Sequence, residues 1–147
     1  MSLFTPLPII LADDDQDDTF LFQEALEQIP LETGLAVAEN GVELLQILKD
    51  ADNKPDIIFL DMNMPVKNGL ECLKEIRSTA RFEQVPIVVL STSVSQHLWE
   101  SAYRCGANMY IQKPNSFNSL VDVLKKCLLD RTNTTIPERV EQFLITN

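Results

Sequence analysis

The sequence contains few of the residues that mark secreted, zinc-binding or nucleic-acid-binding proteins. Its 147 residues include three cysteines and one histidine, and 12 basic residues stand against 22 acidic ones, for a net charge of −10. Binding to nucleic acid requires clustered Lys and Arg, so we expect neither nucleic acid nor an anionic membrane surface as a partner. Cys72, Cys105 and Cys127 are odd in number, widely spaced and without a C-x-x-C pair, which predicts buried free thiols in a reducing compartment.

Long hydrophobic runs are also absent. No apolar stretch approaches the roughly 20 residues needed to span a bilayer, and no basic segment followed by an apolar one indicates a signal peptide. We therefore expect a cytoplasmic protein that does not enter a membrane. An apolar content of 45% and a charged content of 23% are typical of a globular protein. The length suggests one domain, large enough to fold around its own core.

Short apolar runs alternate with amphipathic segments along the chain. The runs are bounded by turn signals, which predicts strands buried on both faces, and the segments between them have the apolar spacing of helices. This alternation predicts an α/β fold, in which helices cover both faces of a parallel sheet through right-handed crossovers. Strands are predicted at 7–12, 35–38, 57–60, 86–90 and 109–112, and helices at 17–29, 42–48, 70–76, 95–105 and 116–129.

The chain divides into a domain at 1–130 and a C-terminal tail at 131–147. Apolar residues in the tail follow a helical spacing. We expect a short helix that packs on the domain or is frayed, and the alternative is a contact in a homodimer. The residues of this stripe are Ile136, Val140, Phe143 and Leu144.

Polar side chains follow four of the predicted strands. Asp13 and Asp14 come after the first strand, Asp61 after the third, Ser91 after the fourth and Lys113 after the fifth. Because the carboxyl ends of parallel strands lie at one edge of a sheet, we expect these side chains to converge there. For the aspartate-rich run at 13–18, the alternative is a solvated loop or helix start.

The converging side chains favour phosphoryl chemistry. Three neighbouring carboxylates repel one another unless a cation neutralises them. Oxygen ligands alone favour Mg²⁺, and the absence of a neighbouring His or Cys disfavours zinc. The Lys113 ammonium and the Ser91 hydroxyl would bind phosphoryl oxygens. A carboxylate held beside that group is a nucleophile for phosphoryl transfer.

At these residues the chain resembles the receiver domains of two-component response regulators, especially the single-domain chemotaxis-regulator type. The resemblance implies a flavodoxin-like (βα)5 fold, a doubly wound sheet with strand order 2-1-3-4-5, and a receiver domain at 1–130. The matching motifs, in family order, are IILADDD at 9–15, DMNMP at 61–65, NG at 68–69, VLSTS at 89–93 and YIQKP at 110–114.

The resemblance implies that Asp61 accepts a phosphoryl group from a phosphohistidine. It also implies a Mg²⁺ ion bound by Asp61, directly by Asp14, through water by Asp13 and by the backbone carbonyl of Asn63. Ser91 and Lys113 would then bind the phosphoryl oxygens. The remaining implied features are a switch aromatic at Tyr110, a cis peptide before Pro114, and tuning of hydrolysis by Asn63 and Ser93.

The predicted function is a stand-alone phosphorylation switch without an output domain. Its partners would be a sensor histidine kinase or histidine phosphotransfer protein and a target protein on the face of the fourth helix, fifth strand and fifth helix. On that helix we expect His97 at the surface and Trp99 in packing. We expect no turnover of an external substrate beyond the chain's own phosphorylation and dephosphorylation.

Two alternatives stay open. A degenerate receiver binds partners without phosphorylation, but it usually lacks a landmark residue, and all of them are present here. An aspartyl-phosphate phosphatase of the haloacid dehalogenase group has a second aspartate two residues after its nucleophile, where this chain has Asn63.

Overall fold

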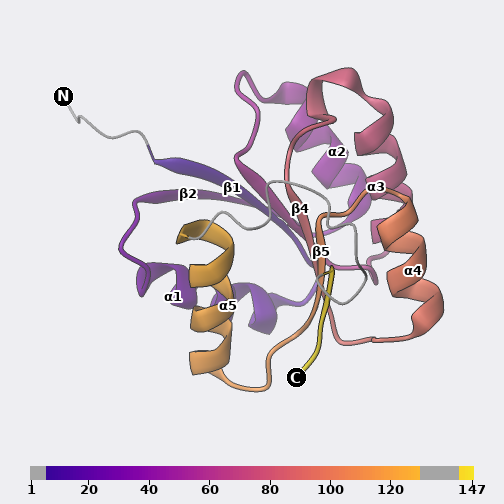
Figure 1. The fold of residues 1–147 in the computed structure, drawn as a ribbon. Helices are drawn as coiled ribbons and strands as arrows, with labels where there is room; N and C mark the ends of the chain where they lie inside the picture. Colours follow the sequence, from indigo (N-terminus) through magenta and orange to yellow (C-terminus); the bar gives the residue numbers. More distant parts are fainter. Residues whose placement is uncertain (1–5, 130–142) are drawn as a thin grey trace.

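One parallel sheet runs through the protein, which a computed structural model describes at residues 6–129 and 143–147. Its strands are β1 (Leu7–Ala12), β2 (Thr33–Ala38), β3 (Ile57–Leu60), β4 (Ile87–Ser91), β5 (Met109–Gln112) and β6 (Leu144–Ile145). They lie in the order β2-β1-β3-β4-β5-β6, and every neighbouring pair is parallel (Figure 1). The predicted order 2-1-3-4-5 is therefore confirmed, with a sixth strand added at its end.

Helices cover both faces of the sheet, as predicted. They are α1 (Gln16–Glu27), α2 (Gly41–Asp50), α3 (Gly69–Ser78), α4 (Gln96–Arg104) and α5 (Phe117–Leu129), with a short 3-10 helix, η1 (Ala80–Phe82), after α3. Figure 1 shows α1 and α5 on one face and α2, α3 and α4 on the other. No helix in the described part of the chain is both long enough and apolar enough to cross a bilayer.

Side chains at the helix starts explain where the helices begin. Asp15, Asn40, Asn68 and Ser95 each accept a hydrogen bond from the backbone N–H three residues later. Such caps satisfy N–H groups that have no partner inside the helix. At α3 the cap is reciprocal, because the Glu71 side chain also accepts from the Asn68 N–H. The aspartate-rich run is thus in part a helix start, the alternative that the sequence left open.

The strands separate two hydrophobic cores. Along β1, Ile9 and Leu11 pack toward α1 and α5, whereas Ile10 and Ala12 pack toward α2, α3 and α4. All four residues of β3 are buried, because both faces of this central strand are covered. Alternation of side chains across a doubly covered strand explains why the sequence shows continuous apolar runs.

The cysteines are free thiols, as predicted, but they are not equally buried. Cys72 and Cys127 are buried, whereas Cys105 is partly exposed. Burial raises the pKa of Cys72 to about 11 and that of Cys127 to about 12. Both thiols therefore stay protonated at neutral pH and act as small apolar groups in the cores.

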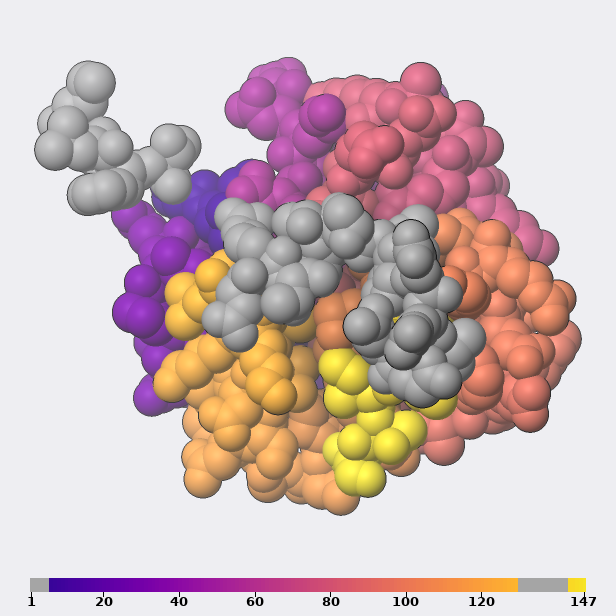
Figure 2. Space-filling model, viewed as in Figure 1, coloured from indigo at the N-terminus to yellow at the C-terminus, as the bar shows by residue number. Residues whose placement is uncertain are grey.

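The described end of the C-terminal tail contains a short strand, and Phe143 just before it is helical. Leu144 and Ile145 pair with Tyr110 and Ile111, so that β6 extends the sheet beyond β5. Figure 2 shows these last residues at the surface, between the atoms of α5 and of α4. The predicted helical stripe does not extend to Leu144, because pairing with β5 satisfies backbone groups that an edge strand would leave unpaired. The predicted stripe positions Ile136 and Val140 lie outside the described residues.

The segment after α3, which the sequence predicts as a polar connection, contains a partly buried polar contact. The Arg77 guanidinium donates to the carbonyls of Gly106 and Phe82 at 2.8 and 2.9 Å and to Asn108 Oδ1 at 2.9 Å. Asn108 is 3% exposed, and its Oδ1 also accepts from the Ile87 N–H. Burial lowers the pKa of Arg77. This contact joins α3 to the starts of β4 and β5, at the opposite end of the strands from the polar cluster.

Candidate functional site

Backbone hydrogen bonds position the polar residues that follow the strands. The Asp61 N–H donates to the carbonyl of Ala12 at 2.9 Å, and the Asp13 N–H donates to that of Ala38 at 2.9 Å. The Lys113 N–H donates to the carbonyl of Ser91 at 2.8 Å. The sheet pairing thus continues one residue past the strands. It fixes both carboxylates and the lysine at one edge of the sheet, as predicted.

Three carboxylates gather at this edge. Asp13, Asp14 and Asp61 each offer an oxygen within 4.8 Å of the others, and they form the only such group among the described residues. Asp13 and Asp61 are 4% and 7% exposed, whereas Asp14 is exposed. Oxygen ligands at this spacing fit Mg²⁺, which binds a few carboxylates and keeps part of its water shell. The predicted metal-ligating aspartates are therefore together in the structure.

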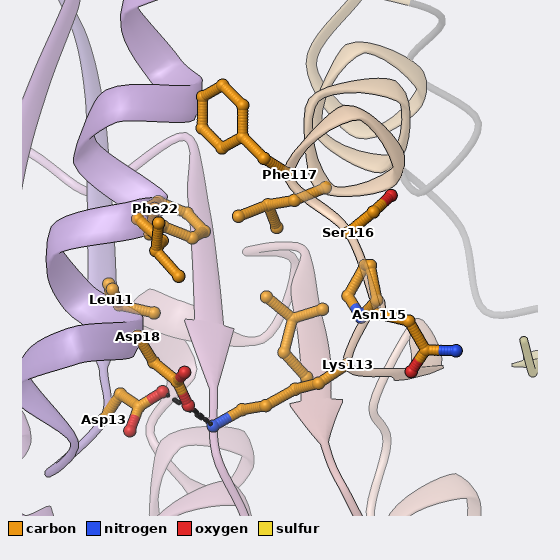
Figure 3. Close-up of a pocket in the computed structure, with 12 residues that line it drawn as sticks. Leu11, Asp13, Asp18, Phe22, Lys113, Asn115, Ser116 and Phe117 are labelled. Carbon is orange, nitrogen blue, oxygen red and sulfur yellow. Dashed lines mark hydrogen bonds and ion pairs between the residues drawn. The ribbon is translucent and has the colours of Figure 1, made fainter.

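Lys113 lies inside this acidic cluster. Its Nζ is 2.7 Å from Asp18 Oδ2, 2.9 Å from Asp13 Oδ2 and 3.2 Å from Asp61 Oδ2. Figure 3 shows the ammonium directed at Asp13 and Asp18, between α1 and the start of α5. Burial alone lowers the pKa of Lys113, but the hydrogen bonds to Asp18 and Asp13 and the carboxylate charges outweigh burial and raise it overall. The lysine therefore remains charged at neutral pH.

The two buried carboxylates are held in different ways. Burial raises the pKa of Asp13, against the lowering effects of the Asp15 N–H and of Lys113. Asp13 Oδ1 accepts from the Asp15 N–H at 3.0 Å, and Asp61 Oδ1 accepts from the Asn63 N–H at 3.2 Å. Each carboxylate thus has one oxygen on the backbone and the other toward Lys113. The implied contact of the Asn63 carbonyl with a metal stays a prediction.

A second group of predicted residues is linked through Ser93. Ser91 is fully buried, and its Oγ accepts from the Ser93 N–H at 3.2 Å. The Tyr110 hydroxyl donates to the Ser93 carbonyl at 2.7 Å. The Tyr110 ring is fully buried, and burial raises the pKa of its hydroxyl. Ser93 therefore connects Ser91 to Tyr110, so that a displacement of Ser91 would also affect the contact of Tyr110.

The Lys113–Pro114 peptide bond is trans, like all described peptide bonds. The cis bond that the resemblance implied is not found. The trans and cis forms of an X-Pro bond differ by only about 0.5–1 kcal/mol, so local contacts decide between them. Here the ammonium of Lys113 reaches three carboxylates from a trans peptide.

The loop after Asp61 passes close to the backbone of the site. A Cβ atom at Gly69 would overlap the carbonyl of Asp61 and lie 2.8 Å from the Cα of Met62. The Gly69 N–H donates to the Met62 carbonyl at 3.1 Å. Only glycine fits where α3 begins against the backbone of Asp61 and Met62. Val66 in the same loop has a φ of 67°, which is strained for a β-branched residue.

Comparison with known proteins identifies the family. The model of the response regulator receiver domain matches residues 9–125. The chain belongs to the response regulator receiver domain family. This receiver domain is 28% identical to the response regulator Rcp1 of Synechocystis sp. over 125 residues, which cover 82% of this chain and 85% of Rcp1. It is 33% identical to the chemotaxis protein CheY of Halobacterium salinarum over 122 residues, covering 82% of this chain and 95% of CheY.

Solved structures agree with this receiver fold. The phosphorylated cyanobacterial phytochrome response regulator RcpA superposes with a TM-score of 0.79 at 30% identity, covering 91% of this chain and all of RcpA. The Mn²⁺-bound form of Rcp1 superposes with a TM-score of 0.77 at 27% identity, covering 90% of this chain and 99% of Rcp1. Membership of this family decides against the haloacid dehalogenase alternative.

Other predicted residues of the receiver domain lie as follows. His97 is exposed on α4, and Trp99 is partly buried and packs against the core on its side of the sheet, as predicted. Asp18 was not singled out in the sequence, because an acid in the first turn of a helix already has an explanation in the helix dipole. The sequence feature that could have indicated Asp18 is its position five residues after Asp13, because the first turn of α1 lies close to the end of β1 at that spacing.

Proposed function

We propose that this receiver domain is a phosphorylation switch of a two-component system, with Asp61 as the phosphoacceptor. The observation that carries the proposal is the position of Asp61. Its carboxylate lies 3.2 Å from the Lys113 ammonium and within 4.8 Å of oxygens of Asp13 and Asp14. The donor is a phosphohistidine of a sensor histidine kinase or of a histidine phosphotransfer protein. The names of RcpA, described as phosphorylated, and of the chemotaxis relatives support this assignment.

In the proposed step, a carboxylate oxygen of Asp61 attacks the phosphorus atom. As the P–O bond forms, the P–N bond to the donor imidazole breaks, and the imidazole leaves with the electron pair and takes up a proton. Negative charge is spread over the phosphoryl oxygens. Lys113 is placed to neutralise part of this charge. Water reverses the modification when it attacks the phosphorus and breaks the bond to Asp61, which releases inorganic phosphate.

Asp13, Asp14 and Asp61 would hold the metal ion. When bound, Mg²⁺ would supply positive charge to the phosphoryl oxygens. The oxygen-only set of carboxylates supports this choice, and the Mn²⁺-bound form of Rcp1 shows that a relative binds a divalent ion. We also propose that the chain turns over no external substrate.

The output would be a contact with a target protein on the face formed by α4, β5 and α5. The hydrogen bonds from the Ser93 N–H to the Ser91 hydroxyl and from the Tyr110 hydroxyl to the Ser93 carbonyl support a route from the phosphoryl group to this face. Because β6 lies beside β5, the last residues of the chain are part of the same face. New charge at Asp61 would draw the Ser91 hydroxyl inward, and Tyr110 would follow.

Intact-mass measurement tests the phosphoacceptor. We expect the protein to gain the mass of one phosphoryl group when it is incubated with Mg²⁺ and acetyl phosphate, and to gain none in EDTA. Asp61→Asn removes the nucleophilic carboxylate, and we expect it to abolish the adduct. The control is Asp52→Asn, an exposed aspartate away from the site, which should retain it. An adduct that persists in Asp61→Asn would contradict the assignment.

A further inference from the structure

The shortest ion pair of Lys113 is made with a carboxylate outside the metal-binding group. Asp18 Oδ2 lies 2.7 Å from the ammonium, whereas Asp13 and Asp61 lie at 2.9 and 3.2 Å. Asp18 belongs to the first turn of α1, where its N–H donates to Asp15 Oδ1 at 2.9 Å. Its side chain is 39% exposed and that of Lys113 is 17% exposed. A carboxylate fixed by a capped helix therefore holds the lysine from one side.

The ammonium has three N–H donors, and the three carboxylates use all of them. A metal ion on Asp13 and Asp61 would neutralise two of these partners. Asp18 is not a member of the metal-binding group and would keep its full charge. In the metal-bound site, Asp18 is then the strongest partner of Lys113.

A phosphoryl group on Asp61 needs the same ammonium. It also brings a second negative charge into the neighbourhood of Asp18, where like charges repel. A cavity of about 130 Å³ lies beside the ion pair, with Asp18 and Lys113 among its lining (Figure 3). Asp13 also lines this cavity, but most of the remaining lining is apolar, so that Asp18 and Asp13 are the only carboxylates beside the lysine there. The apolar residues are Leu11, Leu21, Phe22, Leu90, Pro114, Phe117 and Leu120.

We propose that Asp18 is a positioning residue that holds Lys113 in the unphosphorylated site and competes with the phosphoryl group for its ammonium. This inference rests on the proposed function. It adds that Asp18 has opposite effects on the affinities of the site for the metal ion and for the phosphoryl group. By drawing Lys113 away from Asp13 and Asp61, Asp18 favours metal binding at those carboxylates. By retaining Lys113 once the metal is bound, it opposes binding of the phosphoryl group.

The test compares Asp18→Asn with Asp17→Asn. Asp17 is an exposed carboxylate in the same first turn of α1, so its substitution removes the same charge without the contact to Lys113. The first readout is the dissociation constant of Mg²⁺ alone, measured by titration calorimetry. The second is that of beryllofluoride, a phosphoryl analogue, at saturating Mg²⁺, measured through Trp99 fluorescence.

We expect Asp18→Asn to weaken Mg²⁺ binding roughly two- to fivefold and to tighten beryllofluoride binding roughly two- to fivefold relative to Asp17→Asn, as suits a partly exposed ion pair. A local loosening of the site would weaken both, and that result would overturn the proposal. Equal constants in the two variants, or any other pattern without opposite shifts, would overturn it as well. If the unsubstituted protein binds neither probe, the proposed function itself fails.

Discussion

At the scale of single residues, the loop after Asp61 has one position whose backbone conformation does not suit its side chain. Val66 has a φ of 67° and is 81% exposed. The left-handed region costs a β-branched residue more than it costs asparagine, whose short polar side chain tolerates it. Val66 contributes little burial in exchange, so the strain is largely uncompensated at this position.

Val66→Asn is therefore expected to raise the free energy of unfolding by about 1 kcal/mol. Urea denaturation followed by circular dichroism measures this change. Val94→Asn is the control, because Val94 lies in another loop at the same edge of the sheet and is not among the described residues with positive φ. A gain in both variants would mean that replacing valine, rather than relieving strain, is responsible.

The residue scale also separates what the sequence predicts from what it does not. Asp13, Asp61 and Lys113 follow predicted strands, and sheet geometry alone brings them together. Asp18 could not be assigned to the cluster, because the direction of a side chain at a helix start depends on how α1 packs on the sheet. The trans bond before Pro114 was missed for a related reason, since the small energy difference between isomers lets tertiary contacts decide.

At the scale of elements, the ends of the strands opposite the site depend on one partly buried arginine. Arg77 donates hydrogen bonds to three carbonyls and to Asn108, whose Oδ1 also accepts from the backbone of β4. The sequence placed Arg77 in a polar connection, because nothing in a local pattern indicates that a charge at the end of α3 will be partly buried. Removing it would take one donor away from each of these acceptors in a partly buried contact.

Arg77→Met keeps an apolar stem of similar length but removes every donor. We expect the free energy of unfolding to fall by about 2–4 kcal/mol. In the control Arg104→Met, which loses only an exposed pair with Glu100 on α4, the change should stay within about 0.5 kcal/mol. Similar losses in the two variants, measured by chemical denaturation, would count against a special role for the Arg77 contact.

At the scale of the whole molecule, the fold could be predicted from the sequence except at its last strand. Each of the first five strands has a continuous apolar run and a helix after it, so local pattern and topology agree. β6 contains only Leu144 and Ile145, which are too few residues to show the alternation of apolar and polar side chains, or the apolar run, that would predict a strand. Its formation depends on the open edge of β5, a requirement that arises only after the rest of the sheet is assembled.

The tail belongs to the folded domain through Phe143. This side chain is fully buried, and its ring centroid lies 4.9 Å from that of Tyr103 and 6.4 Å from that of Tyr110. Asn147 adds hydrogen bonds to Gln112 and to the carbonyl of Lys113. The last described residues therefore contact both Tyr110 and the backbone of Lys113.

Phe143→Ala tests whether this contact contributes to folding. Loss of a fully buried phenylalanine costs about 3–5 kcal/mol, a large share of the roughly 5–15 kcal/mol that stabilises a typical domain. We expect a loss of that size in urea denaturation, with coincident transitions by Trp99 fluorescence and circular dichroism. Ile145→Ala removes a side chain that is 37% exposed from the same strand and should cost much less. Equal and small losses would place the tail outside the cooperative unit, because a residue that folds with the domain contributes its burial to the whole transition.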